Sequence, residues 1–94
     1  MSNLVTKAFV EMFGTFIFLS VVLRRPEPIP IAVALAAVIY MGGAISGGHY
    51  NPAITFMNFI GNGDVGQLSM YVVAQILGAV LAFYFFQSTK NITA

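Results

Sequence analysis

Three long apolar runs, separated by short polar stretches, dominate this chain. They cover residues 4–23, 31–45 and 65–86. A helix rises about 1.5 Å per residue, so about 20 apolar residues cross a hydrocarbon core of ~30 Å. The pattern therefore predicts three transmembrane helices, of which the second is short for a crossing unless the chain re-enters the membrane after it.

Residues 46–60, between the second and third runs, follow a different pattern. Two glycines and the only histidine precede the pair Asn51-Pro52. An Asn at the N-cap accepts a hydrogen bond from an orphan backbone N–H, and a Pro at the first helical position has no N–H to lose. A helix that begins at Pro52 is expected to end near Ile60, because Gly61-Asn62-Gly63 follows it. The sequence thus predicts a re-entrant loop and a half-helix of about 13 Å.

The connections and the tail are polar. Residues 24–30 contain two arginines and three prolines, which mark a membrane surface, and Pro30 suits the start of the next helix. Residues 61–64 have the composition of a turn. Residues 87–94 form a polar tail, in which Asn91-Ile92-Thr93 matches the glycosylation sequon at the level of chance.

Composition narrows the class. With 59% hydrophobic and 7% charged residues, the 94-residue chain has too little charge to cover a soluble domain. A net charge of +1 provides no basic patch for nucleic acid, and the absence of cysteine excludes disulfides and thiolate chemistry. We expect one all-α, multi-pass integral membrane domain over residues 1–94, with a first run that is a mature span rather than a cleaved leader. The starting Met1 and the polar tail favour a complete chain.

Two polar side chains interrupt the apolar runs at membrane depth. Glu11 lies about two turns into the first run, and Gln75 lies in the middle of the third. Polar groups within a membrane face protein or water. We interpret both as structural supports that hydrogen-bond the non-helical loop before Asn51. A proton-carrying role for Glu11 is the less favoured alternative.

Three ordered motifs resemble those of the aquaporin and glycerol facilitator (major intrinsic protein) family. Residues 46–55, which include Asn51-Pro52-Ala53, resemble the first signature loop of the family. The family's E-x-x-G-T-F motif is matched by Glu11, Gly14, Thr15 and Phe16. Its Y-x-x-A-Q-x-x-G-A motif is matched by Tyr71, Ala74, Gln75, Gly78 and Ala79. The resemblance covers residues 4–87, and it extends only to the N-terminal half of a family member.

The resemblance implies a fold and a function. Family members consist of two inverted halves, each with three spans and one half-helix, so the chain is expected to be half of such a fold. The implied function is a passive channel for water or small neutral solutes such as glycerol and ammonia, with no cofactor and no catalysis. Two antiparallel copies would close one pore, and eight chains would supply the four pores that the family usually gathers. The alternative is a non-conducting membrane module that needs a separate second half or modulates full-length relatives.

The loop supplies candidate pore groups. Irregular backbone at membrane depth is tolerated only inside protein or beside a water-filled cavity. Residues 44–50 are expected to leave carbonyls unpaired, and the candidates to face the pore are those of Gly47, Gly48, His49 and Tyr50. Capping uses the side-chain oxygen of Asn51, so its NH2 group is free to donate to a passing solute. The positive end of the half-helix dipole opposes cations and protons.

The selectivity-filter candidates are aliphatic or lack a side chain. The family's filter usually includes an arginine just after the second Asn-Pro-Ala, whereas Ile54 follows Ala53 here. The position that resembles the family's filter aromatic falls near Ile31, and Gly48 adds only backbone. Compared with a water-only channel, the sequence therefore predicts a wider or more apolar filter and a less certain exclusion of protons.

His49 has no partner residues for metal binding in the sequence pattern. A lone histidine without cysteine or a carboxylate cluster indicates no metal site. We interpret it as a hydrogen-bonded loop histidine, and a gating or proton-sensing role is the alternative.

The cations are unevenly distributed along the predicted topology. Lys7 lies on one side of the membrane, and Arg24, Arg25 and Lys90 lie on the other. This bias favours an outside N-terminus under the positive-inside rule, whereas the family resemblance implies an inside one. A weak and conflicting bias suits insertion in both orientations.

Overall fold

The computed structural model describes residues 3–92, which contain four helices. They are α1 (Leu4–Arg24), α2 (Pro28–Ser46), α3 (Pro52–Asn62) and α4 (Val65–Thr89). By length and composition, α1, α2 and α4 can each cross a membrane. The predicted all-α fold with three candidate spans is therefore confirmed.

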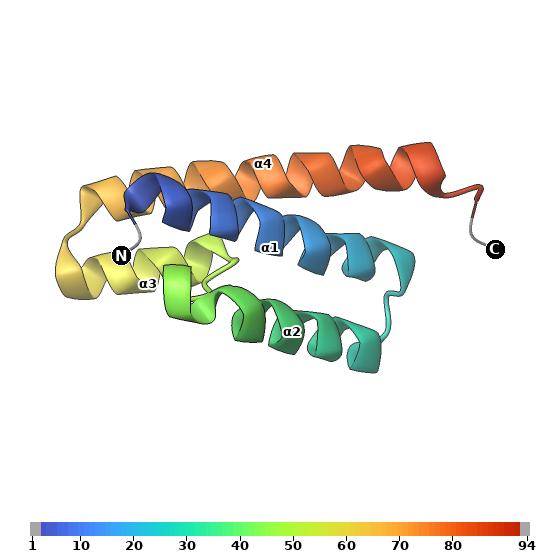
Figure 1. Ribbon diagram of the computed structural model, residues 1–94, viewed down its shortest axis with the longest axis horizontal. Coiled ribbons are helices and arrows are strands. Elements are labelled where there is room, and N and C mark those ends of the chain that lie inside the picture. The colour runs from blue at the N-terminus through green and yellow to red at the C-terminus, as the bar shows by residue number, and fades with distance from the viewer. Residues whose placement is uncertain (1–2, 93–94) are drawn as a thin grey trace.

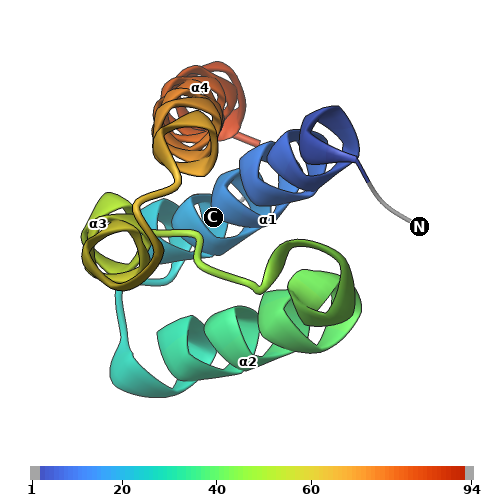
Figure 2. The ribbon, with the colours of Figure 1, turned by 90° about the vertical axis from the view of Figure 1, so that its left-hand side faces the viewer.

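The helices form an open, C-shaped layer. Helices α1 and α4 lie side by side and run in the same direction, and α2 returns antiparallel to α1 (Figure 1). Helix α3 packs against α4; it begins near the middle of the molecule and runs to the end where α1 begins (Figure 1). Seen from that end, α2 and α3 form the two edges of the layer, and within the described range no helix packing joins them (Figure 2).

Helix α2 is longer than its apolar run indicates. It begins at Pro28 rather than near Ile31, because prolines in the first turn lose no hydrogen bond and the N–H of Ile31 reaches the carbonyl of Glu27 at 3.2 Å. It continues to Ser46, where Gly47 adopts a left-handed φ of 92° and caps the helix. The expectation of irregular backbone from residue 44 is thus wrong, since the loop begins at Gly47.

Helices α3 and α4 also extend beyond their expected ends. Helix α3 reaches Asn62 because the left-handed cap lies at Gly63, whose N–H donates to the carbonyl of Phe59 at 2.7 Å. Helix α4 reaches Thr89 rather than residue 86. Its last turn is polar, but the hydroxyls of Ser88 and Thr89 donate to carbonyls four residues earlier. The end of a hydrophobic run therefore does not mark the end of the helix. The sequon residue Thr93 lies outside the described range.

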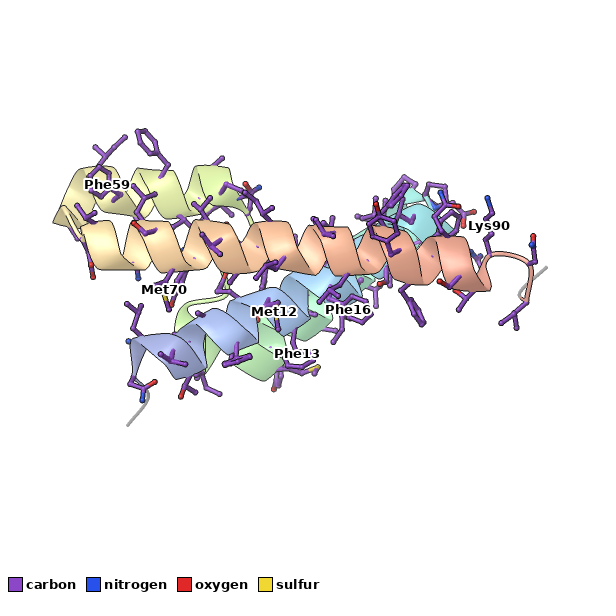
Figure 3. All side chains as sticks on the ribbon, turned by 90° about the horizontal axis from the view of Figure 1, so that it is seen from above. Met12, Phe13, Phe16, Phe59, Met70 and Lys90 are labelled. Atoms are coloured by element: carbon purple, nitrogen blue, oxygen red, sulfur yellow. The ribbon has the colours of Figure 1, made fainter. Side chains whose placement is uncertain are left out.

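The crossing of α1 and α4 holds the layer together. A Cβ atom at Gly78 would lie 2.6 Å from the carbonyl oxygen of Met12 and 3.1 Å from the backbone nitrogen of Phe16, so only glycine permits this approach. Met12 and Phe16 lie where the two helices cross (Figure 3). Farther along, the Arg24 guanidinium donates to the backbone carbonyl and the hydroxyl of Thr89. The C-terminal ends of α1 and α4 therefore lie on the same side of the membrane.

Candidate functional site

The buried carboxylate of Glu11 connects α1 to the loop and to two other helices. It is fully buried, and both of its oxygens accept two hydrogen bonds each. Oε2 accepts from the hydroxyl of Ser46 at 2.7 Å and from the N–H of His49 at 3.0 Å. Oε1 accepts from the N–H of Tyr50 at 2.7 Å and from Nε2 of Gln75 at 3.0 Å. A carboxylate satisfied by four donors is stable without contact with water.

A second set of hydrogen bonds joins α4 to the start of α3. Nε2 of Gln75 also donates to the hydroxyl of Thr55 at 2.9 Å, and the same oxygen lies 2.9 Å from Nδ1 of His49. The His49 ring is buried and stacks edge-on against Tyr71 at a centroid distance of 5.0 Å. The hydroxyl of Tyr71 donates to the carbonyl of Ser46 at 2.5 Å. Both the loop and the first turn of α3 are thus fixed from the α4 side.

Tyr50 anchors the loop on the other side. Its backbone φ is 53°, a left-handed value that is uncommon for a residue other than glycine. Its ring occupies the space that a Cβ atom at Gly14 or Gly42 would need, and its hydroxyl donates to the carbonyl of Val38 at 2.7 Å. The loop is therefore held between α1 and α2 by the Tyr50 side chain, while the unusual φ directs its backbone toward α3.

Asn51 caps the half-helix as the sequence predicts. Its side-chain oxygen accepts from the N–H of Ala53 at 2.8 Å, and Pro52 occupies the first helical position. Among residues 3–92, the NH2 group of Asn51 has no hydrogen-bond acceptor, and residue 51 is exposed. The N-terminus of α3 thus presents an amide donor and the positive end of a helix dipole near the middle of the molecule.

The carbonyl groups of the loop are also unpaired. Within the described chain, no donor reaches the carbonyl oxygens of Gly47, Gly48, His49 or Tyr50. The N–H groups of Gly48, His49 and Tyr50 are all satisfied, by Ser46 and Glu11. The loop backbone therefore has its donors bound internally and its acceptors without a partner, which is the polarity that a hydroxyl- or amine-bearing solute requires.

The filter candidates do not come together in one chain. Ile54 lies in the first turn of α3 and is partly exposed, and the buried Gly48 lies in the loop that precedes α3. Ile31 lies in the first turn of α2, fifteen residues before Ser46, or about 22 Å away along the helix. A filter that contains all three positions needs a second chain.

The sequence pattern indicates no supporting role for four side chains that hold the loop: Ser46, Thr55, Tyr71 and the ring of Tyr50. Ser46 and Thr55 bracket the signature loop, so their place in the motif was a signal that they contact it. The insertion of Tyr50 between two helices had no local signal, because it depends on Gly14 and Gly42, which are far apart in the sequence.

The chain matches the family model described as Major intrinsic protein over residues 27–93. It is 37% identical over 86 residues to glycerol uptake facilitator protein-like 6 of Lactiplantibacillus plantarum, an alignment that covers 81% of this chain. The chain belongs to the major intrinsic protein family. Other relatives in the family are aquaporin-5 of Sus scrofa, 38% identical over 77% of the chain, and aquaporin TIP1-2 of Zea mays, 49% identical over 54% of it.

As a major intrinsic protein with three apolar candidate spans, the chain is an integral, multi-pass membrane protein. It spans less than half the length of the relatives that it matches: 40% of the Lactiplantibacillus protein, 32% of aquaporin-5 and 20% of aquaporin TIP1-2. No solved structure matches it significantly. The half-length match agrees with a fold that contains three candidate spans and one half-helix.

Proposed function

We propose that this protein is a passive membrane channel for water and small neutral solutes, and that two oppositely oriented copies form each pore. The observation that carries this proposal is the loop before α3, whose carbonyls and Asn51 amide have no partner in the described chain while every N–H from Gly48 to Tyr50 is bound. Such groups exchange hydrogen bonds with a solute and perform no reaction, so the proposal is a channel and not an enzyme.

One copy provides only part of a pore wall. Helix α3 begins near the middle of the molecule and so covers only half of its length, and no helix packing joins α2 to α3 in the described range. A second copy, inverted across the membrane, would place its own α3 N-terminus against the first and close the gap between the edges. The two Asn51 amides would then meet near the midplane, as in inverted-repeat transport proteins.

The charges permit this inverted pairing. In the proposed topology Lys7 and Asp64 lie toward one membrane surface, and Arg24, Arg25 and Lys90 lie toward the other, because of their places at the helix ends. Arg25 forms an ion pair with Glu27 at 3.1 Å. An antiparallel pair presents the same set of charges on both surfaces, so the pair as a whole has no orientation preference. Eight chains would supply four such pores.

The filter of this pore would be formed between copies. Inversion brings the α2 start of one copy toward the level of the partner's loop, so Ile31 from one chain and Gly48 with Ile54 from the other are proposed to share a constriction. Aliphatic side chains provide no fixed charge there. We therefore propose that glycerol, ammonia and similar neutral solutes pass together with water, and that exclusion of protons depends on the α3 dipoles and Asn51.

The second candidate is a non-conducting membrane module that needs a separate second half or modulates full-length relatives. It is favoured by the match to only 40% of the Lactiplantibacillus relative. Dependence on a partner separates the two candidates.

The experiment is osmotic shrinkage of liposomes that contain only the purified chain, under a sucrose gradient and then a glycerol gradient. We expect water and glycerol permeabilities several-fold above those of protein-free liposomes. In Asn51→Asp the solute permeabilities should fall, and cations should enter, because a carboxylate cancels the roughly half positive charge at the α3 N-terminus. Folded, inserted protein with the permeability of empty liposomes would contradict self-assembly and favour the separate second half.

A further inference from the structure

Helix α3 has one polar face. Asn58 and Asn62 lie four residues apart in α3, within about 20° of one direction on the helix, and Asn51 is the N-cap directly before the helix. The apolar side chains of Phe56 and Ile60 fall about 140° and 180° away from this direction. The half-helix is thus amphipathic, with two asparagines on its polar side, next to the buried Thr55 that faces α4.

Asn58 differs from the other two asparagines in what its side chain does. The carboxamide of Asn62 serves the following turn, where its oxygen accepts from the N–H of Asp64 at 2.8 Å. Asn58 donates through Nδ2 to the carbonyl of Ile54 at 3.1 Å. This carbonyl belongs to the same helix, so the contact fixes the Asn58 rotamer without joining α3 to another element. In the described chain the Oδ1 atom of Asn58 has no hydrogen-bond partner.

The position of Asn58 along α3 places it partway to the membrane surface. Seven residues separate it from Asn51, or about 10 Å along the axis. The α3 residue that contacts the interior is Thr55, which is fully buried and bonded to Gln75 and His49. Asn58 is only half-buried, and a half-buried carboxamide at this depth is costly if it faces lipid. A water-filled path removes that cost.

We propose that Asn58 is a second solute-positioning residue of the pore, whose Oδ1 accepts a hydrogen bond from a passing water, hydroxyl or amine between Asn51 and the membrane surface. This inference rests on the proposed channel function. In the antiparallel pair, the two copies of Asn58 form one acceptor position on each side of the midplane. A solute with several donors, such as glycerol, gains more from this position than water does.

Two measurements test the proposal. The first uses the cysteine-free chain with a single cysteine at Asn58 or at Ile60, and the rate of reaction with a small water-soluble thiosulfonate in liposomes. Asn58→Cys should react at least tenfold faster than Ile60→Cys, because thiosulfonates react with the thiolate, which apolar surroundings disfavour and water stabilises. Ile60 lies nearer the end of α3, so depth alone predicts the opposite order. Equal rates, or a faster Ile60→Cys, would overturn the proposal.

The second measurement is the ratio of glycerol to water permeability. Asn58→Leu should lower this ratio about fivefold, which corresponds to the loss of one hydrogen bond. Asn58→Gln should retain most of the ratio. Ile60→Leu is the matched control and should leave the ratio unchanged. An unchanged ratio in a conducting Asn58→Leu protein would refute the role of Asn58. If the unmodified chain does not conduct, the proposed function fails, and the cysteine rates still decide whether Asn58 faces water.

Discussion

Glu11→Leu is expected to lower the free energy of unfolding by about 2–6 kcal/mol and to abolish conduction. The substitution removes an acceptor from four buried donors, of which Ser46 still reaches the carbonyl of Gly42 at 3.4 Å and Gln75 still donates to Thr55. Each buried donor that is left without any acceptor costs about 1–3 kcal/mol. Two of the donors are the N–H groups of His49 and Tyr50, which the loop cannot satisfy elsewhere. The loop should therefore lose its conformation before the spans do.

The measurement is reversible unfolding in mixed detergent micelles, followed by circular dichroism, together with the shrinkage rate of liposomes. Glu27→Leu is the control: this carboxylate is exposed at the membrane surface and is expected to change stability by about 0.5 kcal/mol or less. A loss below about 1 kcal/mol in Glu11→Leu would show that the four contacts contribute little, and conduction by this variant would show that the loop does not depend on them.

Gly14→Val is expected to displace the Tyr50 ring and to lower the free energy of unfolding by about 1–3 kcal/mol or more, because it adds bulk to a packed core. The ring of Tyr50 occupies the position that the new side chain would take, and the backbone of α1 on either side is fixed by its packing against α4 and α2. Moving the ring also breaks the hydrogen bond between the Tyr50 hydroxyl and Val38. Conduction should fall with it, since Tyr50 holds the loop between α1 and α2.

Gly61→Ala is the matched control, because it adds a side chain to a helical glycine that has no neighbour within 4 Å. This variant should be as stable as the original protein, or more stable by about 0.5–1 kcal/mol, since alanine favours a helix. Thermal unfolding in detergent measures both variants. If Gly14→Val is no less stable than Gly61→Ala, then the ring of Tyr50 does not fill the space beside Gly14.

Local signals explain which parts of the structure follow from the sequence. The Asn51-Pro52 pair predicts an N-cap because both residues act within one helical turn, and the structure contains this cap. The polar character of Glu11 within an apolar run likewise indicates a protein environment, and its partners are the loop N–H groups that the sequence suggests. In each case the physical cause lies in the residue itself.

Other features depend on residues that meet only in the folded chain. The left-handed backbone of Tyr50 has no local cause, because it is held by Glu11, Val38 and the two glycines beside the ring. The start of α2 at Pro28 could not be predicted from the apolar pattern, because charged residues and prolines surround this position. The first turn of a helix nevertheless tolerates proline. Ile31 and Ile54 lie far apart because α2 runs from Ile31 back toward the loop before α3, and this course of α2 is known only from the fold.

The central claim is that two copies in opposite orientation form the pore. It is tested by joining two copies in one chain. Each copy has three spans, so a direct fusion inserts the second copy inverted, whereas an additional apolar span of about 20 residues in the linker makes the two copies parallel. At fewer than one fused chain per liposome, the fraction of liposomes that shrink fast reports conduction by single molecules. The direct fusion is expected to conduct and the parallel fusion to match empty liposomes. Equal conduction by both, or none by the direct fusion, would contradict the antiparallel pore.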